Sequence, residues 1–201
     1  MLTDSQVERY SRQIVLPEVG GRGQERLLAA SAMIGGGGSA AIFCAAHLAA
    51  AGVGKLRFDG IDANAPLVDA LALHSRNLDC EFHAAPLEQE ADVTILLGEV
   101  DAARPPVGHM LVWGQESTAD VVAARFPTGR GCIPCLSALA ASAKAAPRSG
   151  QLLGALLATI ALRALLGIGA NDRPELLRLA PGAPPLTSSP FPSRPKCPVC
   201  S

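Results

Sequence analysis

The sequence predicts an α/β fold in which a mostly parallel sheet is flanked by helices. An apolar run at Ala32-Met33-Ile34 breaks into four glycines, Gly35–Gly38, and resumes as an alanine-rich helix. A second strand at Lys55–Asp59 and a continuously apolar run at Val93–Leu97 extend this strand, turn, helix and strand pattern. This order is the first half of a doubly wound, Rossmann-like fold, whose ligands bind at the carboxyl ends of the strands.

The first thirty residues predict a helical arm ahead of the sheet. Ser5–Gln13 has the pattern of a short amphipathic helix, and Ile14–Pro17 that of an extended segment. The glycines of Gly20–Gly23 are expected to break the chain before a second short helix at Gln24–Ala30.

The residues after the glycines predict the rest of the core. Ser39–Ala51 is expected to be a helix whose many alanines permit close packing on the sheet, with Gly52 as its C-cap. The other expected elements are a helix at Pro66–Leu73 and strands at Cys80–His83, Met110–Trp113 and Val121–Phe126.

The last third of the chain predicts two helices and a tail. Leu136–Ala143 is expected to be helical, and the apolar stretch Leu152–Ala170 is expected to be a buried helix. Arg163 in its middle argues against a membrane span, because a bilayer makes that charge costly. Pro181–Pro195 predicts a loop-rich tail. We expect one domain over residues 1–201, with an arm (1–30), an α/β core (31–130) and a helical segment with a cysteine-bearing tail (131–201).

Composition narrows the classes of partner. The chain has 201 residues, of which 49% are hydrophobic, and a formal net charge of −1. Nucleic acids and anionic membranes require a clustered basic face, so we expect small-molecule or protein partners, no nucleic acid and no membrane. Met1–Gln6 has neither the basic start nor the apolar core of a secretory signal, which predicts a cytoplasmic protein.

Four of the six cysteines form two identical pairs, Cys132-Ile133-Pro134-Cys135 and Cys197-Pro198-Val199-Cys200. Two such pairs supply the four thiolates of a tetrahedral structural Zn²⁺ site, which would hold the tail to the body of the protein. A disulfide or a redox pair is the alternative, and a cytoplasmic location disfavours the disulfide. Cys44 and Cys80 are interpreted as core residues.

The glycine turn itself points to a phosphate. Glycines let the backbone adopt positive φ or approach a ligand closely, and the following helix N-terminus offers N–H groups and a partial positive charge to an anion. A glycine-rich linker has the same composition, so the turn alone leaves both interpretations open.

Motifs at both ends of the chain make the pattern more specific. They are Arg9-Tyr10-Ser11-Arg12-Gln13-Ile14, Gly23-Gln24, the glycine turn, Ala51-Gly52-Val53-Gly54 and the two cysteine pairs. In order and spacing these motifs resemble the ThiF/MoeB/HesA family, relatives of ubiquitin-activating enzymes. The resemblance implies an adenylyltransferase that uses ATP and Mg²⁺ to activate the C-terminus of a ubiquitin-like or sulfur-carrier protein, usually as a homodimer.

The resemblance also assigns cofactor-binding residues. Gly35, Gly37 and Gly38 match the family's nucleotide turn, and Ala40 stands where its last glycine would be. The pairs Cys132 with Cys135 and Cys197 with Cys200 match its zinc ligands.

Two further assignments concern catalysis. Arg12 matches the arginine that reaches across the dimer toward the ATP phosphates. Asp62 matches an acidic residue after the second strand, and a shift of one residue would let Asp59 bind the ribose hydroxyls. Their alternative roles are a surface arginine for Arg12 and an ordinary turn residue for Asp62.

Several family features are missing. The family's Asn-Leu-x-Arg-Gln motif and its following lysine have no counterpart, and no lysine occurs between Lys55 and Lys144. The magnesium-binding acid after the Val93–Leu97 strand has only Glu99 and Asp101 as displaced candidates. No cysteine lies between Cys135 and Cys197, where some members carry one.

These departures leave a second interpretation open. The chain would then be a degenerate, non-catalytic member that acts as a binding or scaffold subunit. A nicotinamide-dependent oxidoreductase is a third and weaker interpretation, because it explains the glycine turn but neither the Arg9–Ile14 motif nor the cysteine pairs.

Overall fold

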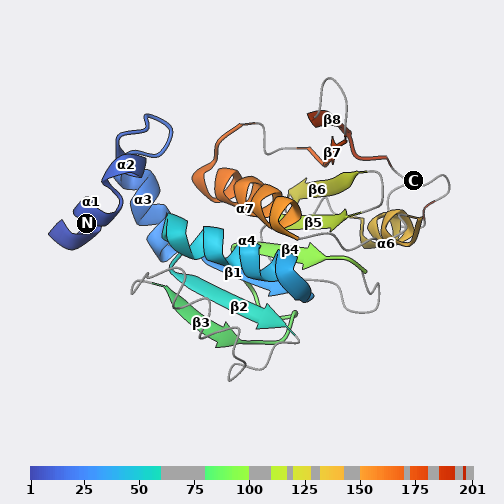
Figure 1. Cartoon of the computed structure of the whole chain (residues 1–201), viewed down its shortest axis with the longest axis horizontal. Coiled ribbons are helices and arrows are strands. Elements are labelled where there is room, and N and C mark those ends of the chain that lie inside the picture. Colours follow the sequence, from blue (N-terminus) through green and yellow to red (C-terminus); the bar gives the residue numbers. More distant parts are fainter. Residues whose placement is uncertain are drawn as a thin grey trace.

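The computed structural model describes residues 1–59, 80–99, 110–116, 120–127, 132–142, 150–169, 173–180, 186–192 and 197. Its centre is one eight-stranded sheet with the strand order β3-β2-β1-β4-β5-β6-β7-β8 (Figure 1). The strands from β3 to β5 are parallel, whereas β5, β6, β7 and β8 pair antiparallel. The strands are β1 (Ser31–Gly35), β2 (Lys55–Asp59), β3 (Glu81–Ala84), β4 (Val93–Leu97), β5 (Met110–Glu116), β6 (Val121–Pro127), β7 (Glu175–Leu179) and β8 (Leu186–Pro190).

Helices cover both faces of this sheet. Alternate strand side chains such as Ile34 and Ile95 form one cluster with α4 and α7, while Met33 and Trp113 pack with α6 on the other face. This arrangement confirms the predicted α/β, Rossmann-like fold. The helices are α1 (Asp4–Arg9), α2 (Ser11–Ile14), α3 (Gly20–Ala29), α4 (Gly38–Ala51), α6 (Ile133–Ser142) and α7 (Gln151–Leu166).

The core elements near the glycine turn have their predicted positions. β2 and β4 have the predicted bounds. Gly52 is the C-cap of α4 and adopts the expected left-handed conformation, with φ of 94°. The predicted helix at Pro66–Leu73 lies outside the described residues.

The N-terminal arm differs from the prediction. The expected break at Gly20–Gly23 is wrong, because α3 begins at Gly20 and runs through these glycines. A Cβ on Gly23 would lie 3.1 Å from Leu166 of α7 and 3.3 Å from Val19, so close packing accounts for a glycine inside this helix. The extended segment expected at Ile14–Pro17 is also wrong, since α2 includes Ile14 and Leu16 donates a backbone hydrogen bond to the Gln13 carbonyl.

The C-terminal third contains a hairpin where we expected a loop. β7 and β8 pair over five positions, from Glu175 with Pro190 to Leu179 with Leu186. Every residue of β8 is exposed, so this edge strand depends on the backbone of β7 and carries no apolar pattern. The predicted helix at 152–170 is α7, which ends at Leu166 with Gly167 as its C-cap. Among the described helices, none has the length and apolar character needed to cross a bilayer.

Candidate functional site

The turn between β1 and α4 requires glycine at successive positions. Gly36 and Gly38 have φ of 100° and 79°, which side-chain-bearing residues rarely adopt. A Cβ on Gly36 would lie 2.7 Å from the Leu97 carbonyl oxygen, and one on Gly35 would lie 2.9 Å from Leu96. Gly37 has open space around it and is the N-cap of α4. The turn therefore lies flat against β4 and exposes the first N–H groups of α4.

A cavity of about 320 Å³ borders this turn, and we call it the glycine-turn cavity. Gly37 and Gly38 line one side, Gly98 and the end of β5 line the second, and Gly150 at the start of α7 lines the third. Its volume is within the range of small-molecule sites, and its place at the carboxyl ends of parallel strands is where such folds bind ligands.

The charge of this cavity differs from what a phosphate site usually offers. None of its described lining residues is lysine or arginine. Gln115 and Glu116, at the end of β5, are 5% and 7% exposed and also line it. We did not predict these two residues; the signal was a pair of polar residues one glycine after the apolar run Met110–Trp113.

Trp113 holds one wall of the glycine-turn cavity. Its indole N–H donates a hydrogen bond of 2.8 Å to the Gly98 carbonyl, and the Gly98 amide donates one of 3.0 Å to the Gly114 carbonyl. Gly98 has a φ of 78°, so the chain turns sharply here and exposes the next residue, Glu99. β4 and β5 thus fix the turn that carries a candidate metal-binding carboxylate.

Three of the predicted zinc ligands come together at the start of α6. The sulfur atoms of Cys132, Cys135 and Cys197 lie within 4.8 Å of one another, and all three residues are buried. We call them the cysteine cluster. The Sγ atoms of Cys132 and Cys197 are 3.4 Å apart, far longer than a disulfide bond. Ligands 2.3 Å from a tetrahedral zinc ion would be about 3.8 Å apart, so this donor set fits a metal. Cys200 lies outside the described residues.

The two remaining cysteines are core residues by position. Burial raises the pKa of the Cys44 thiol to about 12. Burial, together with the charge of Glu81, raises the pKa of Cys80 to about 12 as well. Both thiols are therefore protonated at neutral pH and are poor nucleophiles.

Comparison with known proteins gives partial sequence matches and a nearly complete fold match. No family model matches the chain. "Adenylyltransferase and sulfurtransferase MOCS3" of Bos taurus is 51% identical over 55 residues, which are 27% of this chain and 12% of that protein. "Sulfur carrier protein adenylyltransferase" of Thermus thermophilus is 44% identical over 54 residues, which are 27% of this chain and 20% of that protein. The matches span no more than a fifth of these two relatives.

Solved structures match almost the whole fold. PaaA has a TM-score of 0.70 at 16% identity and covers 95% of this chain, which spans 84% of PaaA. E. coli MccB, solved with ATP, has a TM-score of 0.65 at 14% identity, covering 99% of this chain and 74% of its own. Together, these matches support the resemblance to the ThiF/MoeB family over part of the sequence.

One of the two acidic residues expected near the ribose, Asp59, lies at the same edge of the sheet as the glycine turn. Asp59 is the last residue of β2 and pairs in register with Gly35 of β1, so it lies beside the glycine turn. It is half-buried. Asp62 lies outside the described residues.

Arg12 lies far from the glycine turn of its own chain. Its neighbour Tyr10 and the buried Gln24 pack against Gly52, at the C-terminal end of α4. α2 and α3 lie toward that end of α4 (Figure 1). α4 has 14 residues and is therefore about 21 Å long, with the glycine turn at its opposite end. An exposed arginine on α2 cannot span that length, so within one chain Arg12 does not contribute to the glycine-turn cavity.

Proposed function

We propose that this protein uses ATP to adenylate the C-terminus of a small ubiquitin-like or sulfur-carrier protein. The observation that carries the proposal is the glycine turn, whose positive-φ residues direct the N-terminus of α4 into a cavity at the carboxyl ends of β1, β4 and β5. Backbone N–H groups and the helix dipole suit a phosphate at this position.

The proposed reaction places each group around that turn. A carboxylate at the partner's C-terminus attacks the α-phosphorus of ATP, the bond to the β-phosphate oxygen breaks, and pyrophosphate leaves. Gly37 and Gly38 bind the phosphates through their backbone, and Asp59 accepts hydrogen bonds from the ribose hydroxyls. Glu99 offers a carboxylate of the kind that Mg²⁺ prefers, and the ion would neutralise phosphate charge. Asp62 is a further candidate for a catalytic and cofactor-binding residue at this site.

We further propose that the active form is a homodimer. Arg12 is needed beside the phosphates, where negative charge builds up, yet it lies about one helix length from its own glycine turn. A second copy would bring its Arg12 there.

A non-catalytic binding subunit is the second candidate function. The observation that favours it is the charge of the glycine-turn cavity, whose described lining has no lysine or arginine and includes the buried carboxylate of Glu116. Preorganised positive groups usually supply the largest part of catalysis in such reactions.

ATP–pyrophosphate exchange, measured with a panel of small carrier proteins, tests the proposal. Gly37→Asp is the most informative variant, because a Cβ at position 37 would meet no atom within 4 Å and the φ of Gly37 is an ordinary −130°. Aspartate is a good N-cap and keeps the helix start, but its charge opposes the phosphates. We expect exchange with the wild type, at least a tenfold loss with Gly37→Asp, and a smaller loss with the neutral control Gly37→Asn.

The outcomes separate the two functions. ATP-dependent thermal stabilisation without exchange for any carrier supports the binding subunit. The absence of both signals rules out a nucleotide function. For the homodimer, mixing Arg12→Ala with Gly37→Asp chains should restore part of the exchange, because one site in each mixed pair has both an intact turn and an intact Arg12; no recovery contradicts sharing between chains.

We also propose that the cysteine cluster and Cys200 bind one structural Zn²⁺. The ion would join the start of α6, which carries Cys135, to the tail at Cys197, and four thiolates leave no open position for catalysis. Elemental analysis should find one zinc per chain, whereas a stable, metal-free protein with oxidised pairs contradicts the assignment.

A further inference from the structure

The segment that carries Arg12 has one buried side chain, that of Tyr10. The structure describes all of residues 1–19, and among them only Tyr10, which is 1% exposed, is buried. Neither α1 nor α2 buries a residue of its own. Figure 1 shows these two short helices at one edge of the molecule, beside α3. Helices this short are held by packing rather than by their own hydrogen bonds, so Tyr10 is the residue expected to keep them in place.

The Tyr10 ring packs on the C-terminal end of α4. A Cβ on Gly52, the C-cap of α4, would lie 2.9 Å from Tyr10 Cζ and 3.0 Å from Tyr10 Cε1, so the ring occupies the space that a side chain would need. The Gln24 amide lies against the same glycine, and its Nε2 donates a hydrogen bond of 3.0 Å to the Ala51 carbonyl. Tyr10 and Gln24 therefore pack together against the end of α4.

The backbone of Tyr10 joins α1 to α2. Its N–H donates a hydrogen bond of 2.9 Å to the Gln6 carbonyl. Its carbonyl accepts hydrogen bonds of 2.9 Å from the N–H groups of Gln13 and Ile14. Tyr10 is thus both the C-cap of α1 and the N-cap of α2, and Arg12 is the second residue of α2. A shift of the Tyr10 ring therefore moves the helix that carries Arg12.

α3 gives the Tyr10 contact a fixed base. The Gly54 N–H donates a hydrogen bond of 3.1 Å to the Leu27 carbonyl, and Arg26 donates one of 3.3 Å to the carbonyl of Leu166 in α7. An ion pair of 3.2 Å between the Met1 amino group and Glu25 also joins the start of the chain to α3. Both of its groups are exposed, and such pairs stabilise only weakly, so the buried ring is the stronger contact.

We propose that Tyr10 is a positioning residue, whose ring, held against Gly52, fixes where Arg12 is presented to a second copy of the chain. This inference rests on the proposed adenylylation by a homodimer. Arg12 is exposed, and a charge that stabilises phosphates in a transition state must be held in position. Tyr10 acts only through Arg12, because it lies at the end of α4 opposite the glycine turn.

Kinetics of ATP–pyrophosphate exchange give the first test. Tyr10→Ala should lower kcat at least tenfold and change the KM for ATP less than twofold, as loss of a transition-state contact does. Tyr10→Phe keeps the ring and should stay within threefold of the wild type. Phe126→Ala is the matched control, because Phe126 is also 1% exposed but lies on β6, and it should not reproduce this loss. Tyr10→Leu and Phe126→Leu are the milder pair if an alanine variant does not fold.

Mixing of two variant chains separates positioning from a general structural role. Tyr10→Ala mixed with Gly37→Asp should regain part of the exchange, because one site combines the intact turn of the first chain with the intact α2 of the second. Tyr10→Ala mixed with Arg12→Ala should regain none, since neither chain then presents Arg12 correctly. Recovery in the second mixture, or none in the first, overturns the proposal.

Limited digestion with trypsin gives a readout that needs no activity. Cleavage after Arg9 and Arg12 requires α1 and α2 to open, so its rate reports how firmly they are held. We expect the initial rate to rise at least fivefold in Tyr10→Ala and to change less than twofold in Tyr10→Phe and Phe126→Ala. An unchanged rate in Tyr10→Ala overturns the proposal. Lack of exchange by the wild type with every carrier would instead contradict the proposed adenylylation, and the cleavage rates would still decide whether Tyr10 holds α2.

Discussion

The parallel and antiparallel halves of the sheet each border one cavity, and the two cavities are built from different groups. At the glycine-turn cavity the positive potential comes from backbone N–H groups, and the described lining has a carboxylate but no lysine or arginine. A cavity of about 300 Å³ lies at the other end of α7, beside the antiparallel strands, and we call it the arginine cavity; its described lining has the guanidinium groups of Arg125, Arg163 and Arg173 and the carboxylate of Glu175. Backbone groups cannot be lost by substitution without breaking the turn, whereas arginine side chains can. The turn can therefore persist as part of the fold in a chain that has no counterpart of the Asn-Leu-x-Arg-Gln motif and the following lysine of the ThiF/MoeB family.

The largest expected effect concerns the proposed zinc site at the cysteine cluster, beside the antiparallel half of the sheet. Structural zinc sites contribute about 10 kcal/mol or more of apparent binding free energy, so removing a ligand should destabilise the region strongly. We expect Cys135→Ser to lose zinc and to increase amide hydrogen exchange in α6 and β6 far more than in β1 and β2. Cys80→Ala, outside the cysteine cluster, is the control and should keep one zinc. Uniform exchange across both halves would contradict a local role for the metal.

The second prediction concerns the contact that joins the two halves, where α7 crosses α4. A Cβ on Gly154 would lie 2.7 Å from both the Ala40 carbonyl oxygen and the Phe43 Cβ. Gly154→Ala should therefore lower the free energy of unfolding by about 1–3 kcal/mol through overpacking. Gly21→Ala is the matched control, since Gly21 also lies in a helix but its Cβ would meet nothing within 4 Å. The control should gain about 0.5–1 kcal/mol, as measured by urea denaturation. Equal changes in the free energy of unfolding for the two variants would mean that α7 does not pack closely against α4 at Gly154.

A third prediction alters the charge of the glycine-turn cavity. Glu116→Gln removes the buried carboxylate while keeping its shape. If the carboxylate opposes the phosphates, affinity for ATP should rise roughly 3- to 10-fold, about 1 kcal/mol, in equilibrium dialysis. A fall in affinity would instead show that Glu116 assists binding, as a metal ligand or as a hydrogen-bond acceptor.

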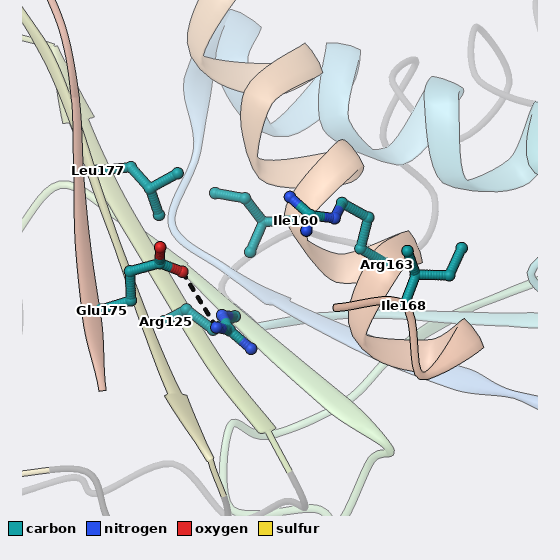
Figure 2. A pocket seen from close by; sticks show the side chains of 6 residues that line it. All are labelled: Arg125, Ile160, Arg163, Ile168, Glu175 and Leu177. Atoms are coloured by element: carbon teal, nitrogen blue, oxygen red, sulfur yellow. Dashed lines mark hydrogen bonds and ion pairs between the residues drawn. The ribbon is translucent and has the colours of Figure 1, made fainter. Parts of the chain in front are cut away.

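The smallest expected effect is the pH dependence of the stability that Glu175, in the arginine cavity, contributes to the fold. Figure 2 shows the ion pair between Arg125 and Glu175. Burial alone would raise the pKa of Glu175, but the hydrogen bonds from Ser188 and Arg125 and the charges of Arg125 and Arg163 lower it overall. The pKa of Glu175 is lower in the folded chain than in the unfolded chain, so the unfolded chain takes up the proton first as the pH falls. The contribution of Glu175 to stability is therefore present at neutral pH and is lost as the pH drops through the acidic range. Because the side chain is 31% exposed, we expect less than about 1 kcal/mol. Denaturation of wild type and Glu175→Gln should differ at pH 7 and converge at low pH; a constant difference contradicts the shift.

The same division between halves separates what the sequence could predict from what it could not. In the parallel half, β2 and β4 have their predicted bounds because their apolar runs end in strong turn residues such as Gly98. The helix expected at Gln24–Ala30 is present as α3, but its start at Gly20 was not predicted, because Gly23 lowers helix propensity, while its packing against Leu166 depends on a residue more than 140 positions away.

The antiparallel half was less predictable. The matched spacing of the two cysteine pairs predicted the cysteine cluster, because the spacing of metal ligands is visible within a few residues of sequence. The arginine cavity has no such signal, because Arg125, Arg163 and Arg173 come from separate elements and meet only when β6, α7 and β7 pack. β8 is exposed and bonded mainly through its backbone, so its residues Leu186–Pro190 resemble a loop in sequence.

The hydrogen bond from Trp113 to Gly98 gives the protein an optical property. Trp113 is the only tryptophan in the chain, and its indole is fully buried beside the turn that borders the glycine-turn cavity. Indole emission depends on the hydrogen bond that the ring donates, so a ligand that shifts Gly98 changes the colour of the intrinsic fluorescence. Emission spectra can therefore report occupancy of the glycine-turn cavity without an attached dye.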